Sequence, residues 1–169
     1  MRIELRKGIT IESCTFTAVI GPEQVAKDLI NNNSNLQRYL FLYVSGNYSR
    51  ILTHVNRTST NFDIQRAFTA HQLFTILNDM SHTVVFIEHD PTLFDGAWDM
   101  IAPIAGALGQ ISRESTVILF SPVADRSFSL LTRNARHVIS FLKDEPARTG
   151  AGSVSEKYAR RVAQMTLDG

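Results

Sequence analysis

The chain has 169 residues, of which 44% are apolar and 20% charged, a composition typical of one globular domain with a buried core. Its net charge of +1 excludes a protein-wide field that attracts nucleic acid, although local basic patches stay open. The one cysteine, Cys14, excludes an internal disulfide framework and favours a reducing compartment. The first residues are too charged for a signal peptide, and no apolar run approaches ~20 residues. We therefore expect a cytoplasmic protein that does not contact a membrane.

Short apolar runs predict the strands of a sheet. The runs are rich in Val, Ile, Leu and Phe and do not alternate with polar residues, which is typical of strands buried on both faces. Helix-length segments separate them, and this alternation predicts an α/β fold with a mostly parallel sheet between two layers of helices. The predicted strands span residues 15–20, 39–44, 62–66, 83–87, 116–120 and 137–142.

Helices are predicted between these strands. One begins at Pro22, because proline is favoured at the first helical position. Another contains Pro103, the one residue that disturbs its helical spacing of apolar side chains. A capping box, Ser153 with Glu156, predicts a last helix over 154–165. We therefore expect a core domain over 1–150 and a C-terminal helix, within 151–169, packed on or near it. The helices predicted before this last one span 22–31, which begins at Pro22, 48–56, 69–78 and 98–111, which contains Pro103.

Residues 21–28, Gly-Pro-Glu-Gln-Val-Ala-Lys-Asp, have the spacing of a phosphate-binding loop, G-x-x-x-x-G-K-[ST]. Gly21 and Lys27 match, whereas Ala26 replaces the second glycine and Asp28 replaces the Ser or Thr. An alanine in the left-handed conformation costs roughly 1–2 kcal/mol, and a carboxylate repels the phosphates that the loop would hold. The same residues also fit an ordinary turn and helix start, and this segment alone favours that interpretation, because a motif with two mismatches in four fixed positions often matches by chance.

Further segments resemble one known family. Residues 43–49, Tyr-Val-Ser-Gly-Asn-Tyr-Ser, are similar to a strand end of the form Y-I-D-T-E-G-x-F-S, and residues 64–73 resemble a stretch containing Arg-Ala and His-Gln-Leu. The chain thereby resembles the core of the RecA/RadA recombinase superfamily, including its KaiC-like archaeal relatives, over residues 15–142. The resemblance implies a three-layer RecA-like fold of the P-loop NTPase type and a role in DNA recombination and repair. It also implies that the polymerisation contact, which recombinases carry ahead of this core, is missing.

The residues that the resemblance would assign to ATP hydrolysis depart from the family pattern. Glu88 stands where the Walker B aspartate is expected, and Ser121 and Pro122 replace the Asn-Gln sensor pair. Phosphoryl transfer depends on positioning and charge neutralisation, so the joint loss of these parts implies that hydrolysis is lost. We expect no catalytic residue, no metal site and no resident cofactor. Weak binding of Mg·ATP would use Gly21, Ala26, Lys27, Asp28 and Glu88.

A basic group follows the fourth buried strand, where recombinases carry a mobile loop that contacts DNA. Arginines with an aromatic ring bind a single strand through phosphate contacts and base stacking. The same residues also fit a solvated helix face with one buried aromatic, which the near-neutral net charge favours. The candidate contacts to DNA or a partner are Arg126, Phe128, Arg133 and Arg136.

Glu88, His89 and Asp90 form a polar cluster at the end of the strand over 83–87. Consecutive strand residues point to opposite faces, so all three converge on one ligand only where the strand ends. Pro91 suggests such an end, at the carboxyl edge where ligands bind in parallel sheets. An ordinary polar strand end remains the simpler interpretation.

The sequence predicts a non-catalytic RecA-like accessory protein that binds DNA or a protein, either another member of the RecA superfamily or a copy of itself. One alternative is a nucleotide-binding switch or slow ATPase that retains Lys27, Asp28 and Glu88. A third hypothesis is an enzyme of unrelated chemistry that uses the Glu88, His89 and Asp90 cluster.

Overall fold

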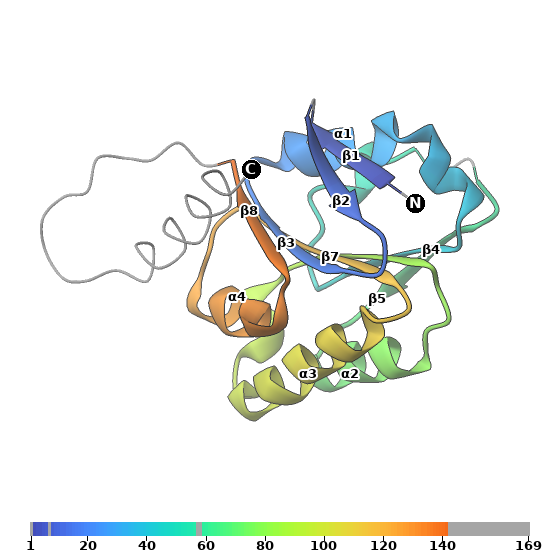
Figure 1. Ribbon diagram of the computed structural model, residues 1–169. Helices are drawn as coiled ribbons and strands as arrows, with labels where there is room; N and C mark the ends of the chain where they lie inside the picture. Colours follow the sequence, from blue (N-terminus) through green and yellow to red (C-terminus); the bar gives the residue numbers. More distant parts are fainter. Residues whose placement is uncertain (1, 7, 57–58, 142–169) are drawn as a thin grey trace, which may run out of the picture.

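A computed structural model describes residues 2–6, 8–56 and 59–141 of the chain (Figure 1). In these residues, six strands form one sheet in the order β5-β4-β6-β7-β3-β8, and every neighbouring pair is parallel. The α/β prediction is confirmed, and the sheet expected to be mostly parallel is wholly parallel in the described chain. The strands are β3 (Phe16–Ile20), β4 (Phe41–Ser45), β5 (Phe62–Arg66), β6 (Val84–Glu88), β7 (Thr116–Ser121) and β8 (His137–Ser140).

Two predictions lie outside the described residues. They are the helix over 154–165, within the expected segment 151–169, and the last part of the expected core domain, 142–150. The division of the chain into 1–150 and 151–169 therefore stays a prediction.

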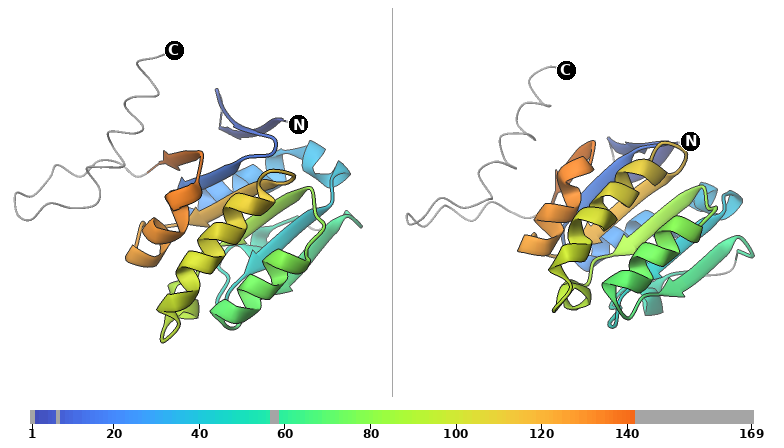
Figure 2. Two further views of the ribbon diagram at one scale, coloured as in Figure 1. Left: turned by 60° about the horizontal axis from the view of Figure 1, so that its bottom comes forward. Right: turned by 90° about the horizontal axis from the view of Figure 1, so that it is seen from below.

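Helices cover both faces of the sheet, which gives three layers (Figure 2). On one face, Leu29 of α1 joins a buried apolar cluster with Phe86 of the sheet. On the other face, Leu73 of α2 and Leu108 of α3 join a second cluster with Leu119. The helices are α1 (Glu23–Asn32), α2 (Ala70–Asp79), α3 (Ile101–Ile111) and α4 (Arg126–Leu131), of which the last three lie on the second face.

An antiparallel hairpin of β1 (Arg2–Arg6) and β2 (Ile9–Glu12) lies over the α1 side of the sheet (Figure 1). No strand was expected in these residues from the sequence. Its apolar residues alternate with charged ones, so one face, with Ile3 and Ile11, is buried while the other meets solvent. The side chain of Asn33 bonds to the backbone N–H and carbonyl of Glu4, which ties the hairpin to the end of α1.

Two of the predicted helices, the one that contains Pro103 and the one over 48–56, have different outcomes in the structure. Pro103 is the third residue of α3, so its missing N–H falls in the first turn, where no partner is needed. The helix expected over 48–56 is wrong, because only Leu52–His54 is helical there, as a single 3-10 turn. The rest of that segment makes an irregular loop, which the site described below uses.

The connections place a crevice at the carboxyl edge of the sheet. The loop after β4 runs to the α1 side, where Ile51 is buried, whereas the segment after β6 runs to the opposite side, where Phe94 is buried. Strands β4 and β6 are neighbours, so the chain diverges between them. Such a divergence is where parallel α/β sheets bind their ligands.

Leu119 tests the central packing, since it is 2% exposed in β7, the fourth of the six strands in sheet order. We expect Leu119→Ala to lower the free energy of unfolding by about 2–5 kcal/mol, because truncation leaves a cavity between sheet and helices. Leu40 is the control, because it directly precedes β4 at the amino edge of the sheet and is 47% exposed. Its change to alanine should cost roughly 0.5 kcal/mol or less. Equal losses of stability in urea denaturation would contradict the layer assignment.

Candidate functional site

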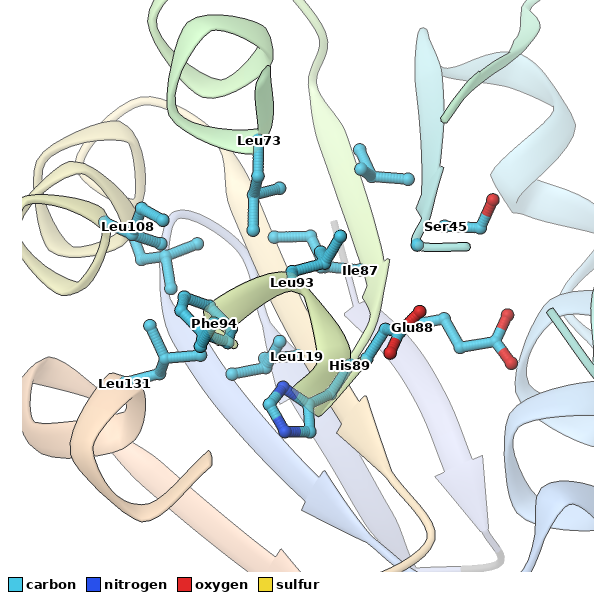
Figure 3. A pocket seen from close by; sticks show the side chains of 14 residues that line it. Ser45, Leu73, Ile87, Glu88, His89, Leu93, Phe94, Leu108, Leu119 and Leu131 are labelled. Carbon is cyan, nitrogen blue, oxygen red and sulfur yellow. The ribbon is translucent and has the colours of Figure 1, made fainter. Parts of the chain in front are cut away.

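The candidate site lies where β4 and β6 diverge, at the cluster Glu88, His89 and Asp90. All three residues are buried, with 6–8% exposure. Figure 3 shows that the His89 ring and the Glu88 side chain leave the strand end on different sides. The cluster therefore divides into two hydrogen-bonded groups rather than converging on one point.

The Glu88 carboxylate accepts three hydrogen bonds from donors on β4 and the loop that follows it. The hydroxyls of Tyr43 and Ser49 donate to Oε2, and the backbone N–H of Arg50 donates to Oε1 at 3.0 Å. Burial, together with the neighbouring Glu88 carboxylate, raises the pKa of the Tyr43 phenol well above its usual value. Tyr43 therefore stays a neutral hydrogen-bond donor, and Glu88 is held as a buried structural acceptor.

Asp90 holds the same loop at a second point. Its Oδ2 accepts the backbone N–H groups of Asn47 at 2.8 Å and Tyr48 at 3.4 Å, and its Oδ1 accepts from the backbone N–H and hydroxyl of Thr92. A side-chain carbon at Gly46 would lie too close to Asp90, at 2.4 Å from its Cβ. Glycine is therefore needed at position 46 for the close approach. We call residues 46–50 the clamped loop.

His89 belongs to a separate group on the α4 side. Its Nε2 lies 2.8 Å from Oδ2 of Asp125 and 3.2 Å from the hydroxyl of Ser127. Its ring packs against Phe94 and Phe128. Burial alone would raise the pKa of the Asp125 carboxyl, but its hydrogen bonds with His89, Ser127 and the Phe128 N–H hold that pKa well below its usual range.

The Ser127, His89 and Asp125 arrangement differs from a nucleophilic triad. Both the serine and the aspartate contact the same ring nitrogen, and the Ser127 hydroxyl donates to Asp125 rather than to the histidine. Ser127 is 3% exposed, so a substrate cannot reach its oxygen. The hollow next to His89 measures about 10 Å³, the space of a single water. This group fixes the start of α4 on β6.

The phosphate-loop segment forms a two-residue turn and a helix. Helix α1 begins at Glu23, directly after Pro22, so Ala26, Lys27 and Asp28 are helical residues. Ala26 is fully buried, Lys27 pairs with Glu23 at 3.7 Å, and Asp28 accepts from the Gln24 amide at 2.7 Å. The described segment therefore has no loop that surrounds a phosphate, although the start of the helix remains.

The start of α1 and Glu88 are nevertheless linked. Arg50 pairs with Glu23 through its guanidinium at 3.8 Å and donates its backbone N–H to Glu88. Among the described residues, Lys27 and Glu88 share no hydrogen bond or ion pair, but they are connected through Glu23 and Arg50 of the clamped loop. Gly21 lies at the other end of the turn. A Cβ added at this position would lie 3.0 Å from the Cβ of Phe141.

The predicted basic group is divided. Phe128 is 1% exposed and packs in the core, so its ring is not on the surface for a base or a partner. Arg126 starts α4 at the carboxyl edge and lies over Trp98 at 5.3 Å. Arg136 precedes β8 at the opposite edge, where it pairs with Glu12 at 3.9 Å, and Arg133 lies in the turn before it. The four residues do not form one patch.

Tyr43, Ser49, Asp125 and Ser127 complete these groups and were missed in the sequence. Asp125 had a local signal, because it directly precedes α4 and its side chain accepts from the Phe128 N–H, as an N-cap does. Ser49 and Tyr43 had no local sequence signal, since both bond to Glu88 across about 40 residues of the chain. In the described residues, no group of three or more His, Cys, Asp or Glu side chains is arranged to hold a metal ion.

The fold and site define a parallel-sheet α/β protein whose carboxyl-edge crevice is closed by its own carboxylates and loop. No family model matches the chain. An uncharacterised protein of Archaeoglobus fulgidus is 34% identical to it over 160 residues, which span 90% of this chain and 81% of that protein. The chain therefore belongs to the same family as the Archaeoglobus protein. Across the described ranges, no helix is long and apolar enough to span a bilayer.

Gly46 tests the clamped loop. In Gly46→Ala the new Cβ displaces the Asp90 carboxylate, which loses its bonds to Asn47 and Tyr48, so we expect about 2 kcal/mol or more of destabilisation. Gly106, in the exposed face of α3, has open space around it and should gain up to about 1 kcal/mol as alanine. Denaturation in urea compares the two, and a neutral Gly46→Ala would contradict the close approach.

Asp125 tests the second group through its pH dependence. Because its pKa is lowered in the folded protein, its contribution is present above the usual carboxyl pKa of about 4 and is lost as pH falls through the lowered pKa. Asparagine also caps helices, so Asp125→Asn removes mainly the charge. We expect a loss of about 1–2 kcal/mol at pH 7 that shrinks at pH 3. A deficit that is the same at both pH values would contradict the charged contact.

Proposed function

We propose that this chain is a non-catalytic RecA-like accessory protein that acts by binding a partner. The observation that carries the proposal is the state of Glu88. A carboxylate that positions Mg²⁺ or water for phosphoryl transfer needs free acceptor positions directed at the metal. Glu88 instead accepts three protein hydrogen bonds and is 7% exposed.

The geometry of residues 21–28 supports the same proposal. A phosphate-binding loop directs several backbone N–H groups at one anion. Here α1 begins two residues after Gly21, so the N–H of Ala26 and those beyond it lie within the helix. The side chains of Lys27 and Asp28 have partners within α1, Glu23 and Gln24. The residues that would bind the phosphates and the residue that would bind Mg²⁺ thus make contacts within the protein instead.

A protein partner fits the surface better than DNA does. The arginines proposed for DNA contact lie at opposite edges of the sheet, and the aromatic ring among them is buried. Binding a single strand needs a continuous positive track with exposed rings. The membership of the RecA superfamily and a role in recombination or repair belong to this proposal. The archaeal source of the Archaeoglobus relative agrees with the archaeal relatives that the sequence resembles.

A nucleotide-binding switch that retains Lys27, Asp28 and Glu88 is the second candidate. What supports it is Arg50, which pairs with Glu23 in the first turn of α1 and donates its backbone N–H to Glu88, so that one residue connects both parts of the candidate site. Binding would have to displace the clamped loop from Glu88. This alternative therefore predicts a measurable interaction with Mg·ATP.

Thermal melting with and without 1 mM Mg·ATP separates the two candidates. A site with a Kd of ~10 μM would stabilise the protein by roughly 2.7 kcal/mol, a shift of several degrees. We expect no shift, with Mg²⁺ alone as the control for ion effects. A shift of several degrees that disappears in Lys27→Ala would contradict the non-catalytic proposal and establish the switch.

A further inference from the structure

Large apolar side chains are exposed along the carboxyl edge of the sheet. They follow four adjacent strands, one after each of β5, β4, β6 and β7. Exposure is high for side chains of this size: 57% for Phe68, 78% for Tyr48, 48% for Trp98 and 58% for Val123. We call these four residues the apolar rim.

The strands that lead to the rim are adjacent in the sheet. Neighbouring strands are ~4.8 Å apart, so the ends of these four strands lie within roughly 15 Å of one another. Tyr48 lies in the loop on the α1 side of the sheet, whereas Trp98 lies ten residues beyond β6, in the 3-10 turn that precedes α3 on the other side. Among the described residues, only two other large apolar side chains are exposed, Leu40 at the opposite edge and Ile64 within β5. Of the six exposed large apolar side chains in the described residues, four thus follow strand ends at the carboxyl edge, and a gathering of apolar side chains on one side of a molecule is typical of a docking face.

Charged side chains of both signs accompany the rim. Arg126 lies over the Trp98 ring, and Arg66 ends β5 next to the turn that carries Phe68. Asp95 and Asp99 flank Trp98 on either side in sequence, and both are exposed. In the described part of the chain, these two arginines and two aspartates form no ion pair within 4.0 Å.

This composition favours a protein over a nucleic acid. Tryptophan, tyrosine and arginine are the residues that contribute most to protein–protein binding. A single-stranded nucleic acid would also stack on the rings, but its phosphates would meet Asp95 and Asp99 beside Trp98. The mixed signs therefore point to a partner face that is itself mixed in charge.

We propose that the apolar rim is a self-association face, at which two copies of this chain dock about a two-fold axis. In a two-fold interface each surface patch meets itself, so a patch that carries both Arg126, over the Trp98 ring, and the exposed Asp99, next to Trp98 in sequence, is complementary in charge to its own copy. Arg126 of each copy then faces Asp99 of the other, and the Trp98 rings pack at the centre. The proposal rests on the protein-binding form of the proposed function and names the partner as a second copy.

The oligomeric state is the first measurement. The rim is small, so the dimer should be weak and concentration-dependent. Sedimentation equilibrium of the full chain between about 1 and 200 μM should show the mass rising from 18.9 kDa toward twice that value. A mass that stays monomeric over the whole range would overturn the proposal. The ATP result does not decide it, because a dimer forms with or without a nucleotide site.

Truncation of the rim is the second measurement. We expect Trp98→Ala and Phe68→Ala each to raise the dimer Kd by about tenfold or more, because aromatic side chains dominate such interfaces. Leu40→Ala is the matched control, an exposed apolar residue at the other edge that should leave the Kd unchanged. Circular dichroism and melting confirm that each variant is folded. A dimer unaffected by both rim variants would overturn the assignment of the face.

Charge exchange tests the symmetry itself. Arg126→Glu and Asp99→Arg should each weaken the dimer, since each places like charges opposite one another. The double variant restores opposite charges across the axis and should recover much of the wild-type Kd. Failure of the double variant to recover would contradict the two-fold pairing. A monomeric wild type that binds a labelled single-stranded oligonucleotide, with the binding lost in Trp98→Ala, would assign the rim to nucleic acid instead.

Discussion

The carboxyl edge depends on two buried carboxylates that hold one loop. Removing Glu88 and Asp90 from water costs several kcal/mol for each charge unless donors replace the lost hydration. The clamped loop supplies those donors, through the N–H groups of Asn47, Tyr48 and Arg50 and the hydroxyl of Ser49. Glycine at position 46 lets the loop approach Asp90 closely enough. The same contacts also fix the position of the loop surface on which the Tyr48 side chain is exposed.

The strands of the sheet were predictable because burial on both faces leaves a continuous apolar run, as in residues 117–120 of β7. The hairpin of β1 and β2 was not predicted, although its residues alternate, because charged side chains on its outer face make the segment resemble a polar terminus. The prediction of a helix over 48–56 was wrong for a different reason. The backbone N–H groups of Tyr48 and Arg50 bond to Asp90 and Glu88, at and just after the end of β6, and this tertiary contact replaces the predicted helix.

The site was predictable in part. Strand alternation alone implied that Glu88 and His89 would point apart, and they do. The partners that receive them were not predictable, since Tyr43 is 45 residues from Glu88 and Asp125 is 36 residues from His89. For the phosphate-loop segment, by contrast, the sequence pattern was visible but the predicted structure did not form. Its residues are present at the expected intervals, but the helix starts at Glu23, after Pro22, so the spacing does not produce a loop.

The magnitudes indicate why this edge favours surface binding over a ligand in the crevice. Hydrogen bonds to a charged group contribute about 1.5–3 kcal/mol each, so freeing Glu88 from its three donors costs on the order of 5 kcal/mol or more. Binding at a Kd of 1 mM to 1 μM releases only about 4–8 kcal/mol. A ligand that must displace the clamped loop would therefore lose most of its affinity. A partner that docks on the outer side of the loop, where Tyr48 is exposed, meets no such cost and keeps the internal contacts intact.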